Sequence, residues 1–362
     1  MKTYHFKTGL LLLATALFSM TACSNEDHED VLAHWTWDSD PEPTPEPDGK
    51  DPNPKIIAQG WTNVTADFEG LPEYINVYKK SKTSDDKGAV AFIAVADMTK
   101  AKFEISNDIH WSDAASGNGN EALYTPTEFY NNNGKPAIVI NGGLFFESGG
   151  FYYSQSAAYS NGVMLCPNQN YYSENWVDFW YPTLGFFYQD KATGQFHATW
   201  TYYANDGCDY SYADCKVIDF DVPETANPTA TSPSQGTKLN NGETVKDGIG
   251  GVGVLVHDGI IRNTWQYEML DVSADSNQPR TAVGYAKEDN KLVFFVCEGR
   301  NMTEGVAGMT TGEVALQLSA IGCTEALNLD GGGSSCMLVN GKETIKGSDG
   351  RQRKVIDACF IR

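Results

Sequence analysis

The chain has 362 residues, which is enough for one large domain or two small ones. Its formal net charge at pH 7 is −21. Such an acidic surface repels nucleic acid and anionic lipid, so general electrostatic attachment to a phosphate polymer is disfavoured and no nucleic-acid partner is predicted. An anionic substrate would therefore need a local site that carries positive groups.

The first residues have the pattern of an export signal. Lys2 and Lys7 precede an apolar stretch from Gly9 to Phe18, and small residues lead up to Cys23. This arrangement is typical of a bacterial lipoprotein signal. We therefore predict a signal peptide over residues 1–22, a lipid on Cys23, and a protein anchored at the bacterial outer membrane or cell surface. An ordinary signal peptide followed by a chance cysteine is the alternative.

Residues 23–54 form the next segment, in which prolines and acidic residues alternate from Asp38 to Pro54. A stretch of this composition buries little apolar surface and tends to stay extended. We predict that it is a tether. The globular domain is then predicted over residues 55–362, with its first strands at 75–78 and 90–95.

The remaining sequence predicts an α+β domain that consists mainly of antiparallel sheets. Strand patterns outnumber helical ones and are mostly joined by hairpin-length turns, as between residues 281–286 and 291–296. One main helix is predicted at about 311–322, because Thr310 and Glu313 have the spacing of a capping box and apolar residues follow on one face.

The cysteines suggest one cross-link. Cys208 and Cys215 enclose a short segment, and in an exported protein that spacing suggests a hairpin disulfide. Most of the other cysteines lie in apolar surroundings and are equally consistent with buried thiols. There is no pair of cysteines with metal-ligand spacing and the six histidines are scattered, so we predict neither a metal nor a cofactor.

Two regions in the middle of the chain allow more than one interpretation. Residues 151–187 are rich in aromatic side chains, which build a core or stack on sugar rings. Residues 223–246 are rich in Thr, Ser, Pro, Asn and Gly and predict a long surface loop, either disordered or a lid over a site.

Two glycine turns follow apolar strands. The first is Asn141-Gly142-Gly143, and the second is the run from Asp330 to Ser335 with three glycines. Glycine lets a ligand approach backbone amides closely, and free amides and hydroxyls suit an anion. A tight hairpin is the alternative for the second turn, but polar residues that border a turn between apolar strands need partners.

Five blocks together resemble the phosphodiester glycosidase family. They are Asn141–Phe146, Gly250–Gly259, Arg280–Gly284, Gly299–Arg300 and Asn328–Ser335. Two departures stand out, because Glu298 occupies a position where the family usually has Asp and Leu144 interrupts the usual aromatic run.

The resemblance implies a hydrolase that cleaves a sugar 1-phosphodiester and releases the sugar. Two carboxyl groups are the usual apparatus of glycoside hydrolysis, and Asp330 and Glu298 are the candidates, with Asp330 as base or nucleophile. Arginine is suited to binding phosphate. The predicted substrate-binding residues are Asn141, Gly142, Gly143, Arg280, Arg300, Asn328, Gly331, Gly332, Gly333 and Ser334.

We expect the segments that carry these residues to converge at one pocket. Arg280, Arg300 and Asp330 should point into it, and the aromatic segment after Phe151 should form a wall. A surface lipoprotein that binds carbohydrate without cleaving it is the alternative function. A hydrolase with a divalent ion on Asp330 and Glu298 is less favoured, because hard cations require more carboxylate ligands.

Overall fold

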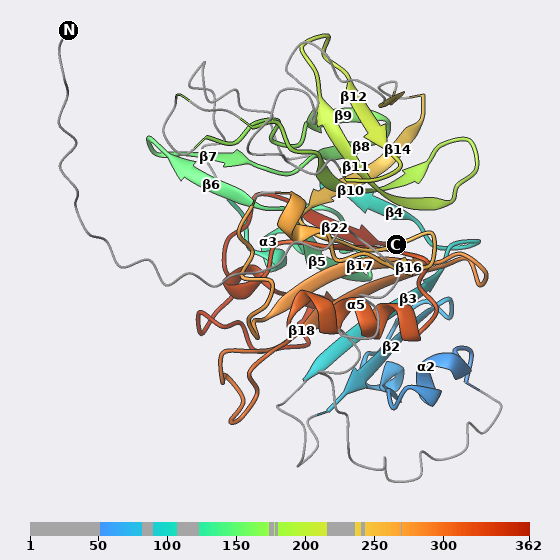
Figure 1. Cartoon of the computed structure of the whole chain (residues 1–362). Helices are drawn as coiled ribbons and strands as arrows, with labels where there is room; N and C mark the ends of the chain where they lie inside the picture. The colour runs from blue at the N-terminus through green and yellow to red at the C-terminus, as the bar shows by residue number, and fades with distance from the viewer. Residues whose placement is uncertain are drawn as a thin grey trace, which may run out of the picture. The chain divides into compact units, whose positions relative to one another are not determined.

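The computed structural model describes residues 51–81, 90–106, 123–173, 177, 180–215, 236–239, 243–268 and 270–362 (Figure 1). The predicted signal peptide, Cys23 and most of the tether lie outside these ranges. So do residues 223–235 and 240–242 of the predicted long loop.

The described residues begin at 51, a few residues before the predicted boundary at 55. Asn53 is buried, and its Nδ2 donates to the hydroxyl of Tyr78 at 2.7 Å. Helix α2 (Pro54–Ala58) follows directly. Pro54 was assigned to the tether, but proline also suits the first turn of a helix because its missing N–H needs no partner there.

An eight-stranded sheet contains the hairpin predicted from residues 281–296. Its strand order is β1-β2-β3-β18-β17-β19-β15-β16, and each neighbouring pair is antiparallel. The bounds are β1 Thr62–Asn63, β2 Ile75–Lys80, β3 Ala91–Asp97, β15 Val254–His257, β16 Ile260–Ile261, β17 Arg280–Ala286, β18 Lys291–Cys297 and β19 Glu325–Asn328.

The remaining strands of the described residues form three further sheets. The seven-stranded sheet has the order β13-β12-β11-β10-β14-β8-β9, the five-stranded sheet β21-β20-β5-β22-β4, and β6 pairs with β7. Their bounds are β4 Phe103–Ile105, β5 Ile138–Asn141, β6 Phe145–Ser148, β7 Phe151–Ser154, β8 Ala158–Ser160, β9 Val163–Cys166, β10 Leu184–Asp190, β11 Phe196–Tyr203, β12 Asp209–Tyr212, β13 Thr237–Leu239, β14 Val245–Gly251, β20 Met337–Val339, β21 Lys342–Glu343 and β22 Ala358–Ile361.

One aromatic cluster joins the three large sheets. Phe103 of β4 packs edge-on against Phe187 of β10, Phe196 of β11 and Phe294 of β18, with ring centroids 5.5–6.3 Å apart. All four rings are buried. Edge-to-face pairs contribute beyond their buried area, so this cluster helps to hold the sheets together as one core.

Helices are few, as predicted. The described residues contain three α-helices, which are α2, α3 (Pro126–Asn132) and α5 (Thr311–Ala320). The predicted capping box of α5 is confirmed, because Thr310 Oγ1 accepts the amide of Glu313 and the Glu313 carboxylate accepts the amide of Thr310. No helix in the described ranges is both long and apolar enough to cross a membrane.

The second glycine turn connects two different sheets. Strand β19 before it belongs to the eight-stranded sheet, and β20 after it belongs to the five-stranded sheet. The hairpin alternative for this turn is therefore wrong. The next turn, at Asn340 and Gly341, is a hairpin in which both residues have positive φ, which is the geometry that an Asn-Gly pair favours.

The predicted disulfide is not formed, since both Cys208 and Cys215 are free thiols. Strand β12 occupies the residues between them. The four residues of this strand alone advance the chain by roughly 10–13 Å, whereas a disulfide needs Cα atoms about 4–7 Å apart. The sequence spacing suggested a loop, and the strand removes the proximity.

Candidate active site

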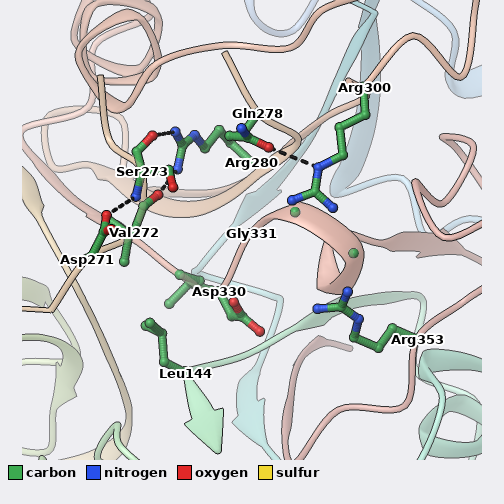
Figure 2. Close-up of a pocket in the computed structure, with 13 residues that line it drawn as sticks. Leu144, Asp271, Val272, Ser273, Gln278, Arg280, Arg300, Asp330, Gly331 and Arg353 are labelled. Atoms are coloured by element: carbon green, nitrogen blue, oxygen red, sulfur yellow. Dashed lines mark hydrogen bonds between the residues drawn. The ribbon is translucent and has the colours of Figure 1, made fainter. Parts of the chain in front are cut away.

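A pocket of about 210 Å³ opens at the second glycine turn (Figure 2). It is formed where the loop before β17, the end of β18, the turn after β19 and the segment before β22 meet. Segments far apart in the chain therefore converge here. Its lining residues are Leu144, Asp271, Val272, Ser273, Gln278, Arg280, Arg300, Leu329, Asp330, Gly331, Gly332, Gly333 and Arg353.

Asp330 is the carboxylate of the glycine turn. Burial raises its pKa to about 6, although the Ser334 hydroxyl, the positive charge of Arg353 and the Gly331 amide act in the opposite direction. Its backbone amide donates to the carbonyl of Gly142 at 3.1 Å, which fixes the turn against the first glycine turn. A carboxylate with a pKa near 6 can exchange a proton at neutral pH.

Two arginines extend toward this turn (Figure 2). A Cβ atom built on Gly332 would lie 2.8 Å from Nη2 of Arg300, and one built on Gly333 would lie 2.1 Å from Nη2 of Arg353. Arg300 is oriented by Gln278 Oε1 at 2.9 Å from its Nε. Only glycine leaves room for both guanidinium groups here, and together they make a positive site beside Asp330.

Arg353 also has a fixed orientation. Its Nε and Nη2 both lie 2.8 Å from Oδ2 of Asp349. The sequence analysis did not single out Arg353. A signal was present, because the run Arg351-Gln352-Arg353-Lys354 is a basic cluster in a strongly acidic chain.

Arg280 lines the pocket but does not have the predicted role of a free phosphate ligand. It is 2% exposed, and its guanidinium donates to the carbonyl oxygens of Met309, Val272, Ser273 and Ser276 at 2.6–2.9 Å. These bonds occupy most of its donors. Arg280 therefore holds the loop over residues 272–276 in place (Figure 2).

The two predicted asparagines are buried and lie behind the pocket. Asn141 Nδ2 donates to the carbonyl of Asp330 at 2.7 Å, and its Oδ1 accepts from the Thr281 hydroxyl and the Cys336 amide. Asn328 Nδ2 donates to the carbonyl of Val252 at 3.0 Å. Neither lines the pocket. Asn141 therefore holds the carboxylate turn in place, and the predicted substrate-binding role fits neither asparagine.

The amides of the glycine turn are less available than predicted. The Gly332 amide donates to the carbonyl of Pro279 at 2.9 Å, and the Ser334 amide donates to the carbonyl of Gly331 at 3.1 Å. Gly332 and Ser334 belong to a 3-10 turn, Gly332–Ser334. The expectation that this run of amides would bind an anion is therefore wrong for these two residues.

Gly142 and Gly143 do not line the pocket either. A Cβ atom on Gly142 would lie 2.2 Å from Oδ1 of Asp357, and one on Gly143 would lie 2.3 Å from Cβ of Ser156. These are close packing contacts in the interior. The first glycine turn therefore supports the second from behind.

Glu298 lies at a different pocket. It is 3% exposed, its Oε2 accepts the amide of Lys346 at 3.2 Å, and it does not line the pocket of Asp330. Glu298 and Arg300 are two residues apart but line separate cavities. The prediction that Glu298 shares a site with Asp330 is wrong.

Two other carboxyl groups accompany Asp330. Asp271 is exposed on the pocket rim, where its Oδ1 accepts the amide of Ser273 at 2.7 Å. Asp357 is buried behind the first glycine turn, and its Oδ1 accepts the amide of Gly143 at 2.8 Å. Burial and, to a smaller extent, the charge of Asp330 raise the pKa of Asp357 to about 7, although the Gly143 amide acts in the opposite direction.

The sequence analysis used neither Asp271 nor Asp357. The signal at Asp357 was an acidic residue inserted between the apolar pairs Val355-Ile356 and Ala358-Cys359. A charged residue in an apolar run is uncommon and needs a partner. Asp271 had no such signal, because it lies in a polar loop.

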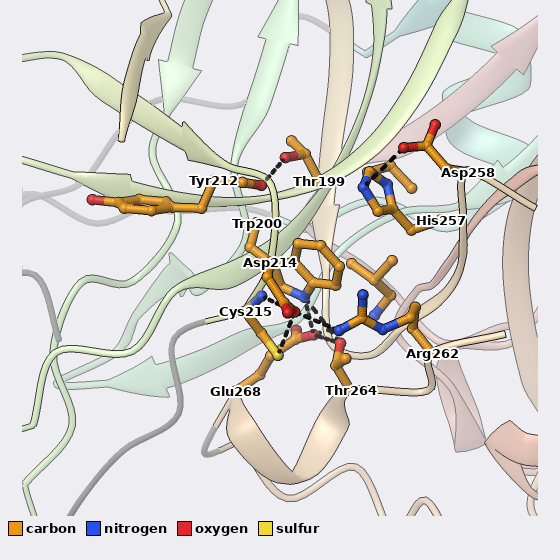
Figure 3. A network of polar contacts seen from close by, with 12 residues as sticks. Thr199, Trp200, Tyr212, Asp214, Cys215, His257, Asp258, Arg262, Thr264 and Glu268 are labelled. Carbon is orange, nitrogen blue, oxygen red and sulfur yellow. Dashed lines mark hydrogen bonds and ion pairs between the residues drawn. The ribbon is translucent and has the colours of Figure 1, made fainter. Parts of the chain in front are cut away.

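Glu268 is a buried carboxylate with a structural role, and it contrasts with Asp330 (Figure 3). Glu268 is fully buried, and it accepts from the amides of Gly185, Gly253 and Val254 and from the side chains of Trp200 and Thr264. Its hydrogen-bonding capacity is used within the fold. Asp330 opens to a pocket instead.

One group of side chains has the composition of a metal site. Among the described residues, His257, Asp258 and Glu325 gather within ligand distance (Figure 3 shows the first two). Glu325 already accepts the amides of Ala198 and Asp258, and Nδ1 of His257 lies 2.7 Å from the carbonyl of Ala198. These atoms are engaged with the protein, and none of the three residues lines the pocket of Asp330.

The predicted aromatic wall is absent from this pocket. None of its described lining residues comes from 151–187, and Leu144 provides the apolar contact instead. Many of the aromatic residues in that range are buried, including Tyr153, Tyr159, Phe186 and Phe187. In the described part of the segment they contribute mainly to the core.

The family model for phosphodiester glycosidase matches residues 185–362. An uncharacterised SPbeta prophage-derived protein of Bacillus subtilis, YomE, is 38% identical over 90 residues, which is 24% of this chain and 14% of that protein. The chain therefore spans only a small part of that relative's length.

Two solved structures are similar in fold. One is a hypothetical protein from Synechocystis, with a TM-score of 0.50, 14% identity, and coverage of 83% of this chain and 67% of that chain. The other is the catalytic domain of zebrafish N-acetylglucosamine-1-phosphodiester alpha-N-acetylglucosaminidase, with a TM-score of 0.51, 18% identity, and coverage of 81% and 85%. Asp330 and the three arginines that line the pocket fall inside the range that the family model matches. Residues 185–362 of the chain are therefore similar to the phosphodiester glycosidase family.

Proposed function

We propose that the protein hydrolyses the glycosidic bond of a sugar 1-phosphodiester and releases the sugar. The observation that supports this most directly is the pocket in which Asp330, with its raised pKa, lies beside Arg300 and Arg353. Arginine forks match phosphate oxygens in geometry and charge. The family of the matched residues points to the same chemistry.

In the proposed reaction, Arg300 and Arg353 bind the phosphodiester and place the anomeric carbon near Asp330. The bond between that carbon and the phosphate oxygen breaks, and its electron pair leaves with the phosphate monoester. Asp330 acts either as the base that takes a proton from the attacking water or as the nucleophile that water later displaces. A phosphate monoester is a stable anion and leaves with little help from a general acid, so a single carboxylate provides most of the catalysis.

Asp330→Asn tests this proposal, because the amide keeps the shape and loses the ionisable group. We expect kcat on a sugar 1-phosphodiester of methanol to fall by about 10²–10⁴ at pH 7, the usual contribution of a positioned acid or base. Asp275→Asn is the matched control, since Asp275 is exposed in the neighbouring loop and does not line the pocket.

Full activity in Asp330→Asn would disprove the assignment. Tight binding of the diester by the wild type with no product after long incubation would instead support the alternative of a carbohydrate-binding protein.

The location of the protein is a separate part of the proposal. We propose that Cys23 carries a lipid that anchors the chain at the outer membrane or cell surface, on the basis of the sequence pattern before it. Radiolabelled palmitate should be incorporated into the wild type and not into Cys23→Ala. Equal labelling of both would show that Cys23 is not the attachment point.

A further inference from the structure

A second, larger cavity of about 710 Å³ lies next to the pocket of Asp330. Drug-sized ligands usually occupy roughly 300–1,000 Å³, so the 210 Å³ pocket is too small for a whole sugar phosphodiester and the second cavity has room for a further group. Its described lining residues are Lys79, Val90, Phe92, Glu298, Met302, Thr303, Glu343, Thr344, Ile345, Lys346, Gly347, Gly350 and Arg351.

The two cavities are lined by residues that lie near one another in the chain. Glu298 lines the larger one and Arg300 the smaller one, and Cα atoms two residues apart are at most about 7 Å from each other. Downstream, Gly350 and Arg351 line the larger cavity and Arg353 the smaller one. The segments 298–300 and 350–353 therefore border both cavities.

Positive groups gather in this cavity although the whole chain carries a net charge of −21. Lys79 and Arg351 have no carboxylate within ion-pair distance in the described residues, and the ammonium of Lys79 lies 5.5 Å from the ring centre of Phe92. Among the described residues, the ammonium group of Lys346 contacts neutral oxygens, with its Nζ 3.0 Å from Oγ1 of Thr303. These three cations are available to an anionic group.

The two carboxylates that line the cavity differ in whether they have hydrogen-bond donors. Glu343 accepts from Nε2 of Gln352 at 2.7 Å. Glu298 is 3% exposed, and its Oε1 is buried without a hydrogen-bond partner in the described residues. An unpaired buried carboxylate oxygen is costly. The atom is also closed off from solvent, so Glu298 contributes charge to this wall and not a contact with a ligand.

We propose that this cavity binds the group on the far side of the phosphodiester, and that this group carries a second phosphate. The inference rests on the proposed function. Lys79 and Arg351 bind the second phosphate. The preferred substrate class is then a chain of sugars or polyols joined by successive phosphodiesters, rather than a sugar phosphate with a small neutral group.

Two substrates test this inference. They share one sugar 1-phosphate, which is esterified either to methanol or to glycerol that carries a terminal phosphate. We expect the wild type to have a kcat/KM about tenfold higher for the second substrate. Lys79→Gln/Arg351→Gln should remove that preference without changing the methanol diester. Solvent screens such exposed charges and limits the effect to about this size.

The control variant is Lys342→Gln/Lys354→Gln, which removes two exposed positive charges that do not line the cavity. It should keep the preference. If the wild type cleaves both substrates equally, or if the cavity variant keeps the preference, the second-phosphate site is disproved and the proposed glycosidase function stands.

If the wild type cleaves neither substrate, the proposed function fails and binding decides the matter. Calorimetric titration with glycerol 3-phosphate should then show binding to the wild type and at least tenfold weaker binding to Lys79→Gln/Arg351→Gln. No binding to the wild type, or equal binding to both proteins, would overturn the anion site as well.

Discussion

The two glycine turns look alike in sequence and differ in what surrounds them. At Gly142 and Gly143 an added Cβ atom would meet buried Asp357 and Ser156. At Gly332 and Gly333 it would meet the outer ends of Arg300 and Arg353. The first turn uses glycine to let interior atoms pack closely, and the second uses it to let cationic side chains approach Asp330.

The two turns should therefore respond differently to substitution, one in the stability of the protein and the other in its activity. Interior atoms cannot move away from an added methyl group, because protein cores are close-packed. The end of a partly exposed arginine can move, but it then loses its position in the pocket. Substitutions at the first turn should therefore affect folding, and substitutions at the second should affect catalysis.

Gly142→Ala should have a large effect on folding. Its Cβ atom would lie 2.2 Å from Oδ1 of Asp357, and relieving such a contact in a core costs about 3 kcal/mol of unfolding free energy. Denaturant titration measures this loss. In an Asp357→Ala background the same substitution should cost clearly less, because the clashing oxygen is gone. An equal cost in both backgrounds would show that Asp357 is not the obstacle.

Gly333→Ala should mainly lower activity. Its Cβ atom would displace the guanidinium of Arg353, which is partly exposed, so we expect kcat/KM to fall at least tenfold while the unfolding free energy changes by less than about 1 kcal/mol. Kinetics and thermal denaturation of the same preparation measure both. A large loss of stability with normal activity in the remaining folded protein would remove the contrast between the turns.

Asp357→Asn should change how stability depends on pH. Burial raises the folded-state pKa of Asp357 to about 7, whereas an unfolded aspartate titrates near 3.9. Between these values the folded protein holds a proton that the unfolded chain has released, so this group lowers wild-type stability as pH rises from about 4 to 7.

The asparagine variant lacks this proton. Its stability relative to the wild type should therefore increase over that pH window, by up to about 4 kcal/mol, because each pKa unit corresponds to about 1.4 kcal/mol. A constant difference between pH 4 and pH 8 would contradict the raised pKa.

Arg353→Gln should produce the smallest shift, in the pH profile of activity. The ionised form of Asp330 is the active one, so kcat/KM should fall as pH drops through about 6. Arg353 lowers the pKa of Asp330, and its removal should move this acidic limb to higher pH by a fraction of a unit. Arg353→Lys keeps the charge and should keep the limb in place even if substrate binding weakens.

Local features of the fold could be predicted from the sequence because they depend on a few neighbouring residues. The capping box at Thr310 and the hairpin at Asn340-Gly341 are set by side chain–backbone contacts and by positive φ. The disulfide was wrong because it required knowing that the residues from Asp209 to Tyr212 form a strand.

The site was harder to predict because it depends on side-chain direction. Arg280 and Arg300 both belong to the β17–β18 hairpin region, but Arg280 is a paired strand residue whose side chain turns to backbone carbonyls. Arg300 lies three residues beyond β18 with a φ of 55° and reaches the pocket. For the same reason Glu298 does not line the pocket where it was expected, and Arg353, which was not predicted, does.

The loop over residues 272–276 is held by Arg280 through carbonyl oxygens alone. Every amino acid has a carbonyl, so the anchor places no demand on the identity of the residues that it grips. Natural variation or a designed library could therefore replace Val272, Ser273 and Ser276 while the loop keeps its course. The buried guanidinium of Arg280 thus fixes the backbone of this pocket rim independently of its side chains. Homologous proteins could therefore change the side chains of the rim without changing its backbone.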